Sequence, residues 1–180
     1  MVGCGVWFGE DSPHNMSTRP QGKQTVNRAE LTAVILSVRK ALGLLDVQQK
    51  LVVHSDSKYC IDGINISMQK WSMDGWTRRG QPLRNADLWQ VMQRALTAMK
   101  EANIKVEFRH VPAHVGIYGN ERADRLAKAA KNRGHKAVPR TEQELNDSDI
   151  DRMADSIIAA CCNAHASASP DCVHAYVDSD

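Results

Sequence analysis

The sequence predicts an α/β domain with a mixed β-sheet, and three observations support this. Apolar residues recur with the 3.6-residue period of an amphipathic helix over residues 27–42 and again over residues 85–101. Short runs rich in β-branched residues, at 51–55 and 104–108, have the length and composition of strands. Strand-like and helix-like segments alternate along most of the chain, which is typical of α/β proteins.

The elements that these patterns predict are, in chain order, a strand at 3–9, a helix at 27–42, a strand at 51–55, a short helix at 57–64, a helix at 85–101, a strand at 104–108, a helix at 120–131 and a strand at 171–178. Asn85 is a candidate N-cap for the helix that follows it. Residues 66–84 have no clear period and predict an irregular excursion. Residues 134–170 predict a linker that holds one helix, at 147–160.

The composition is that of one ordinary globular domain. The chain has 180 residues, 42% hydrophobic and 24% charged, with a formal net charge of +2. No apolar run approaches the roughly 18 residues that span a bilayer. The five cysteines form no CxxC pair, so neither a disulfide framework nor a zinc site is indicated. We therefore expect a soluble, intracellular monomer, with cytoplasm, nucleus and mitochondrion all left open.

Acidic residues stand at the ends of predicted elements. Glu30 falls in the first turn of a predicted helix, Asp56 directly follows a predicted buried strand, and Asp124 lies in the first turns of another helix. Each position alone has an ordinary structural explanation, because acids near helix N-termini interact favourably with the helix dipole. Their significance depends on the motifs around them.

Those motifs carry a resemblance to a known family. The three acids lie in Asn-Arg-Ala-Glu-Leu at 27–31, His-Ser-Asp-Ser at 54–57 and Gly-Asn-Glu-Arg-Ala-Asp-Arg-Leu-Ala at 119–127, in that order. With the loop His-Val-Pro-Ala-His-Val-Gly at 110–116 and the segment 71–84, the sequence resembles the type 1 ribonuclease H family over about residues 3–133.

The resemblance implies a ribonuclease H-like fold, with a five-stranded mixed sheet flanked by helices. It also implies an endonuclease that hydrolyses the RNA strand of RNA–DNA hybrids with two Mg²⁺ ions, for which Mn²⁺ can substitute. Hard oxygen ligands suit Mg²⁺, and two such ions can clamp a scissile phosphate. Glu30, Asp56 and Asp124 carry over as metal ligands. His114 carries over as a residue for proton handling or product release, unless it is simply an exposed loop histidine.

The family's usual first strand, which ends in Tyr-x-Asp-Gly, does not precede Gly3. The tail instead reads Tyr176-Val177-Asp178-Ser179, which looks like that strand with serine in place of glycine. We therefore expect a circularly permuted domain, with a core at 1–133, a linker at 134–170 and the first strand at 171–180. Asp178 becomes the fourth catalytic and metal-binding carboxylate, and Asp180 is a weaker substitute for it.

The resemblance also implies a surface for the hybrid. The expected substrate-binding residues are Lys23, Thr25 and Asn85 at a DNA-strand phosphate, Asn27 near RNA 2′-hydroxyls, and Trp71, Trp76, Arg78 and Arg79 in a basic protrusion. Aromatic faces and cations together give affinity without sequence preference. For both tryptophans a place in the core is the alternative.

Two other functions stay open. The chain could be a hybrid-binding module that lost catalysis with its first strand, or the nuclease domain of a retroelement polyprotein. The tail distinguishes catalysis from mere binding: a paired strand at 171–178 would complete the acidic site, and an unpaired one would leave it incomplete.

Overall fold

The computed structural model describes residues 1–45, 49–133 and 172–179. The elements are β1 (Cys4–Trp7), β2 (Met16–Thr18), α1 (Val26–Leu42), β3 (Lys50–Ser55), α2 (Lys58–Asp62), the π-helix η1 (Gly63–Ser67), α3 (Met68–Met73), β4 (Thr77–Arg78), β5 (Gln81–Pro82), α4 (Ala86–Glu101), β6 (Lys105–His110), α5 (Tyr118–Asn132) and β7 (Cys172–Ser179). The predicted linker and its helix lie outside the described residues. No described helix is both long and apolar enough to span a membrane.

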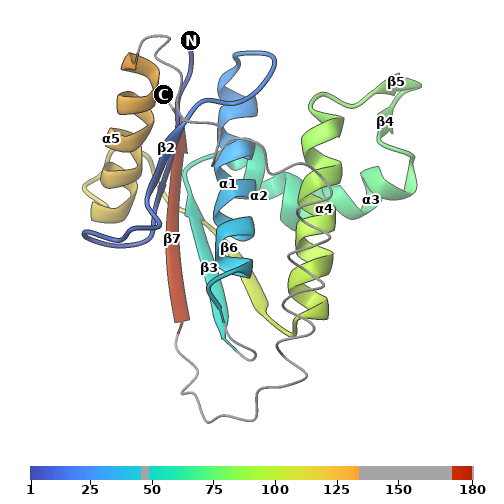
Figure 1. Ribbon diagram of the computed structural model, residues 1–180. Helices are drawn as coiled ribbons and strands as arrows, with labels where there is room; N and C mark the ends of the chain where they lie inside the picture. The colour runs from blue at the N-terminus through green and yellow to red at the C-terminus, as the bar shows by residue number, and fades with distance from the viewer. Residues whose placement is uncertain (46–48, 134–171, 180) are drawn as a thin grey trace.

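Five strands form one mixed sheet in the order β2-β1-β7-β3-β6. β7, the last strand in sequence, lies at the centre of the sheet, antiparallel to β1 and parallel to β3. Cys4 is opposite Ser179, so residues near the two ends of the chain lie together (Figure 1). The predicted mixed sheet and C-terminal strand are therefore confirmed.

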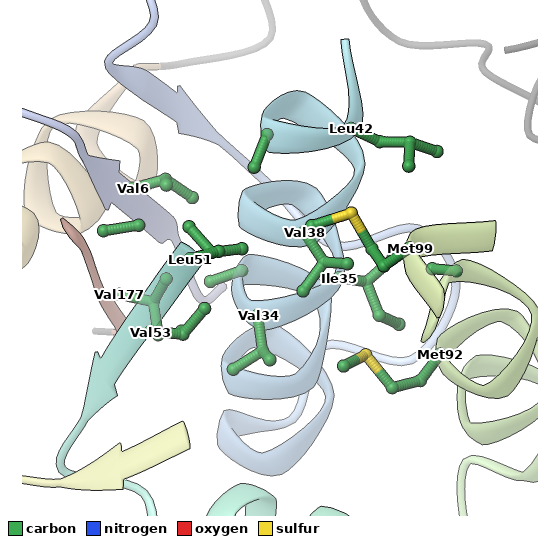
Figure 2. Close-up of a cluster of buried hydrophobic side chains, with 14 of the residues drawn as sticks. Val6, Val34, Ile35, Val38, Leu42, Leu51, Val53, Met92, Met99 and Val177 are labelled. Atoms are coloured by element: carbon green, nitrogen blue, oxygen red, sulfur yellow. The ribbon is translucent and has the colours of Figure 1, made fainter. Parts of the chain in front are cut away.

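The core lies between one face of the sheet and helices α1 and α4. Helix α1 has apolar residues on the face toward the sheet, as its period predicts, and they pack against side chains of β1, β3 and β7 (Figure 2). Val177 of β7 is fully buried in this cluster. Because side chains alternate along a strand, its neighbours Tyr176 and Asp178 point to the opposite face.

Helix α5 covers that opposite face over β1 and β7 (Figure 1). Its close approach requires glycine on β1, because a Cβ on Gly5 would lie 2.0 Å from the Ala123 carbonyl oxygen, and one on Gly3 would lie 2.0 Å from that of Ala127. These glycines bring the backbone of α5, and with it Asp124, close to the sheet.

Two predictions about local structure are wrong, and a third is confirmed in position but not in hydrogen bonding. Residues 66–84 are not irregular, since they contain α3 and the β4–β5 hairpin. Strand β2 was not predicted, because its three residues carry no clear strand pattern. Glu30 is the fifth residue of α1, beyond its first turn. Asn85 occupies the N-cap position of α4, as predicted, but in a left-handed conformation with φ of 56° and without a side-chain capping bond. Its amide is engaged with other side chains.

Replacing Gly5 with alanine should destabilise the protein strongly. The new methyl group would collide with backbone rather than with a movable side chain, so α5 must shift, and we expect the free energy of unfolding to fall by about 3 kcal/mol or more. Urea unfolding measures the loss. Gly75→Ala is the control, since nothing lies within 4 Å of its Cβ position and only its φ of +65° opposes alanine, at about 1–2 kcal/mol. An equal loss in both variants would contradict the close contact.

Candidate active site

Two parallel strands deliver two carboxylates to the same edge of the sheet. Ser55 of β3 pairs with Val177 of β7, so the next residues, Asp56 just beyond β3 and Asp178 near the end of β7, lie side by side. Asp178 is only 6% exposed. The side-chain Nδ2 of Asn120 in α5 joins them, at 3.3 Å from Asp56 Oδ2 and 3.4 Å from Asp178 Oδ2.

Burial is the main reason that the pKa of Asp178 is raised, to about 7. The charge of Asp56 raises it next, the backbone N–H of Ser179 partly opposes this, and the charges of Asp124 and Glu30 raise it further. Three other carboxylates therefore lie near enough to disfavour ionisation of Asp178. The four residues form one electrostatic unit, which we call the acidic cluster.

Glu30 enters the acidic cluster from α1. The Ser57 hydroxyl donates a hydrogen bond of 2.6 Å to Glu30 Oε2, while the same hydroxyl accepts from the Cys60 backbone N–H at the start of α2. Burial raises the pKa of Glu30, the Ser57 hydrogen bond partly lowers it, and the charge of Asp56 raises it again. Ser57 thus ties Glu30 to the chain directly after Asp56.

Asp124 enters from α5, in the turn after Asn120. Its Oδ2 accepts from Lys128 Nζ at 2.5 Å, an i,i+4 ion pair on the same helix. The lysine offsets one of the charges that would otherwise repel the other carboxylates.

Of the two histidines in the described segment 110–116, only His110 has a hydrogen-bond contact with a residue of the cluster. His114, expected to handle protons, is an exposed loop residue with φ of 53°, and among the described residues no hydrogen bond joins it to the four carboxylates. His110 instead lies with Nε2 3.2 Å from the backbone oxygen of Asp56. Sequence reasoning did not single out His110, Asn120 or Ser57, although all three stand inside or beside the acidic motifs.

The residues expected at a DNA-strand phosphate gather at the starts of α1 and α4. Thr25 caps α1 by accepting from the Arg28 backbone N–H at 3.3 Å. The Arg28 guanidinium donates to the Gln21 carbonyl at 2.7 Å and to the Asn85 side chain at 3.4 Å, and forms an ion pair with Asp87. Arg28 therefore links the loop that contains Lys23 to Asn85.

Asn85 also donates from Nδ2 to the Tyr59 hydroxyl at 3.2 Å, while its Oδ1, the atom that would cap α4, accepts from Arg28. Lys23 and Asn27 are exposed on either side of the Thr25 cap, as binding residues would need to be.

The basic protrusion consists of α3 and the β4–β5 hairpin, which extend away from the sheet beside α4 (Figure 1). Arg78 and Arg79 are exposed on the hairpin. Trp71 packs edge-on against the buried Trp89, with ring centroids 5.2 Å apart, and Trp76 is partly buried beside the core. The structure therefore assigns both tryptophans a packing role, and their contact with a hybrid stays a prediction.

The acidic cluster fits hard divalent cations. Its donors are carboxylate oxygens, and burial with mutual repulsion makes the cluster costly until positive charge enters it. Within the described ranges, no three His, Cys, Asp or Glu side chains already converge as ligands of one ion. Asp124 is instead paired with Lys128.

A mixed five-stranded sheet with four carboxylates at the end of its central strand defines a protein of the ribonuclease H-like class. The family model described as RNase H matches residues 1–132. The chain therefore belongs to the ribonuclease H family, and its relatives place it with the type 1 members as predicted. That family uses divalent metal ions.

Curated relatives carry the same family name. "Ribonuclease H" of Schizosaccharomyces pombe is 38% identical over 71% of this chain and 45% of its own length, and "Ribonuclease H1" of Homo sapiens is 35% identical over 71% of this chain and 42% of its own. "Ribonuclease H" of Janthinobacterium sp. is 44% identical over 61% of this chain and 68% of its own. The chain thus spans less than half of the fission yeast and human relatives.

Solved structures share the fold. A foamy viral protease-reverse transcriptase in complex with RNA/DNA hybrid superposes with a TM-score of 0.55 at 24% identity, over 67% of this chain and 15% of that one. The native Prototype Foamy Virus Protease-Reverse Transcriptase gives 0.51 at 21% identity, over 74% and 20%. At these identities the likeness concerns the fold alone.

The raised pKa of Asp178 predicts that the metal-free protein loses stability as pH rises. Between about pH 4 and 7 the folded state holds a proton that the unfolded state has released, so stability falls across this window, by at most about 4 kcal/mol from Asp178. Asp178→Asn removes that ionisation and should flatten the profile, which urea unfolding in EDTA from pH 4 to 8 measures. The exposed Asp62→Asn is the control and should keep the wild-type slope. A wild-type stability that rises steadily from pH 4 to 7 would contradict a raised pKa at Asp178.

Proposed function

We propose that this chain is an endonuclease that hydrolyses the RNA strand of RNA–DNA hybrids with two Mg²⁺ ions, for which Mn²⁺ can substitute. The observation that carries the proposal is the position of Asp178, which β7 places beside Asp56 in a cluster with Glu30 and Asp124. The names of the curated relatives support it.

The four carboxylates would hold the ions. When bound, two Mg²⁺ ions supply an activated water and stabilise the leaving 3′ oxygen. The protein's contribution is to fix the oxygen ligands on rigid elements: two strand ends for Asp56 and Asp178, and two helices for Glu30 and Asp124. Ser57 and Asn120 hold three of these side chains in place.

We further propose that the domain is circularly permuted, with β7 as the equivalent of the family's first strand. Its central place in the sheet, next to β1 and β3, supports this, as does the sequence that it carries. Asp180, the weaker substitute for Asp178, lies outside the described residues.

Hybrid recognition would use shape and phosphate charge. Lys23, Thr25 and Asn85 would meet a phosphate of the DNA strand, and Asn27 would lie near 2′-hydroxyls of the RNA strand. Arg28 supports this assignment because it holds the loop at 21–25 and Asn85 together. Arg78 and Arg79 would meet phosphates farther along the duplex, and His114, exposed on its loop, would handle protons or product release.

Cleavage of an end-labelled hybrid tests the activity. With Mg²⁺ we expect the wild-type chain to cut the RNA strand, and Asp178→Asn to lower kcat by roughly a thousandfold or more, because losing a charged ligand misplaces both ions. Asp62→Asn, which removes an exposed acid from α2, should cut like wild type. Binding of the hybrid without any cutting by wild type would favour the binding module. If Asp178→Asn cut as fast as wild type, another acidic residue would be the metal ligand in its place.

Hybrid affinity at increasing salt tests Lys23. Removing one phosphate contact should weaken binding and reduce the slope of log Kd against log salt by about one, with kcat unchanged. We expect this for Lys23→Ala, measured by fluorescence anisotropy with a labelled hybrid in Ca²⁺, which prevents turnover. Lys100→Ala, an exposed lysine at the end of α4, is the control. The same slope for both variants would argue against a phosphate contact at Lys23.

A further inference from the structure

Asn120 lies near the start of α5, where the helix packs closely against β7. It is the third residue of the helix and only 3% exposed. The preceding residue, Gly119, approaches β7 so closely that a Cβ there would lie 2.4 Å from the Tyr176 ring. The N-cap of α5 is Ile117, without a side-chain capping bond. The start of α5 is therefore fixed against β7, and the Asn120 side chain does not cap its own helix.

A single nitrogen of Asn120 serves two carboxylates from different strands. Its Nδ2 carries two protons, and the acceptors are Oδ2 of Asp56 and Oδ2 of Asp178, at 3.3 and 3.4 Å. The other oxygen of Asp178 accepts from the Ser179 backbone N–H at 2.6 Å. One oxygen of each carboxylate is thus directed to the same point on α5, and this fixes the rotation of both groups.

The oxygen of the Asn120 amide has no hydrogen-bond donor among the described residues. This atom, Oδ1, is buried. A buried acceptor without a donor costs stability, so packing alone does not favour asparagine here over a small apolar residue. The amide nitrogen and its two carboxylate acceptors are the chemistry that offsets this cost.

We propose that Asn120 is a positioning residue that holds Asp56 and Asp178 side by side, so that the pair is oriented for a divalent cation before the cation binds. The neutral amide holds the two carboxyl groups together and adds no charge. A lysine at this position would neutralise one of them. A cation then binds to two carboxylates that already lie together. The entropy cost of orienting the Asp56 and Asp178 side chains falls on folding and not on metal binding. The role rests on the proposed function, since it concerns the same acidic cluster.

A purely structural role is the competing explanation, in which Asn120 only ties α5 to the sheet. Measuring metal affinity in the absence of substrate distinguishes the positioning role from the purely structural one. We expect Asn120→Ala to weaken Mn²⁺ binding to the full-length chain by about tenfold or more, measured by titration calorimetry at one fixed pH, because outer-shell partners of metal ligands act on affinity at this scale. Asn65→Ala is the matched control. It removes one amide donated to the Phe108 carbonyl at 3.3 Å, away from the cluster, and should leave the Mn²⁺ affinity unchanged.

The effect should also depend on Asp178. In an Asp178→Asn background, Asn120→Ala has only one charged partner left to position, so its further effect on Mn²⁺ binding should be much smaller than tenfold. Should Asn120→Ala fail to fold by circular dichroism, Asn120→Ser takes its place. Its hydroxyl can donate to one carboxylate only, so we expect an intermediate weakening.

Unchanged Mn²⁺ affinity in a folded Asn120 variant would overturn the proposal, and so would a tenfold loss that is equally large in the Asp178→Asn background. Hybrid cleavage is read separately. A wild-type chain that binds Mn²⁺ but cuts no hybrid would refute the proposed endonuclease, while the difference in Mn²⁺ affinity between Asn120→Ala and Asn65→Ala would still decide the role of Asn120.

Discussion

The pairing of β7 with strands on both of its sides is the constraint on which the rest of the structure depends. In the order β2-β1-β7-β3-β6, β7 joins a β1–β2 hairpin to a parallel β3–β6 pair. Its apolar side chains complete the core under α1, while Tyr176 and Asp178 face α5. The same strand therefore closes the sheet, fixes α5 through the contact of Tyr176 with Gly119, and delivers the most strongly perturbed carboxylate of the site.

Repulsion among the four carboxylates of the acidic cluster destabilises the folded protein, and neighbouring polar groups offset part of this effect. Ser57 donates to Glu30, Lys128 pairs with Asp124, and Asn120 bridges Asp56 and Asp178. None of these partners removes the repulsion at Asp178, whose pKa stays raised because the group is buried. A fold built only for stability would place apolar or paired groups here, and retained strain of this kind is typical of sites that bind charged ligands.

Hydrophobic period predicted the regular elements that pack with one face on the core. Helices α1 and α4 and strand β3 begin and end close to the expected residues, since burial of one face leaves a repeat in the sequence. The segment 66–84 was misinterpreted for the converse reason. It contains the end of η1, the short helix α3 and a hairpin of two two-residue strands, and Trp71 of α3 packs on Trp89 of α4. Asn85 occupies the expected N-cap position of α4, but its Oδ1 accepts from Arg28 rather than from a backbone N–H of the helix.

The sequence by itself singled out the four carboxylates that the structure brings together, because Glu30, Asp56, Asp124 and Asp178 each lie in a short contiguous motif. It also determined that the tail is a strand. Only the tertiary structure decided how these groups meet. Asn120 bridges Asp56 and Asp178 across 64 and 58 residues of chain, and His110 rather than His114 contacts Asp56. Such contacts depend on strand order, register and the close approach of α5 over Gly5, and these non-local properties leave no periodic trace in the sequence.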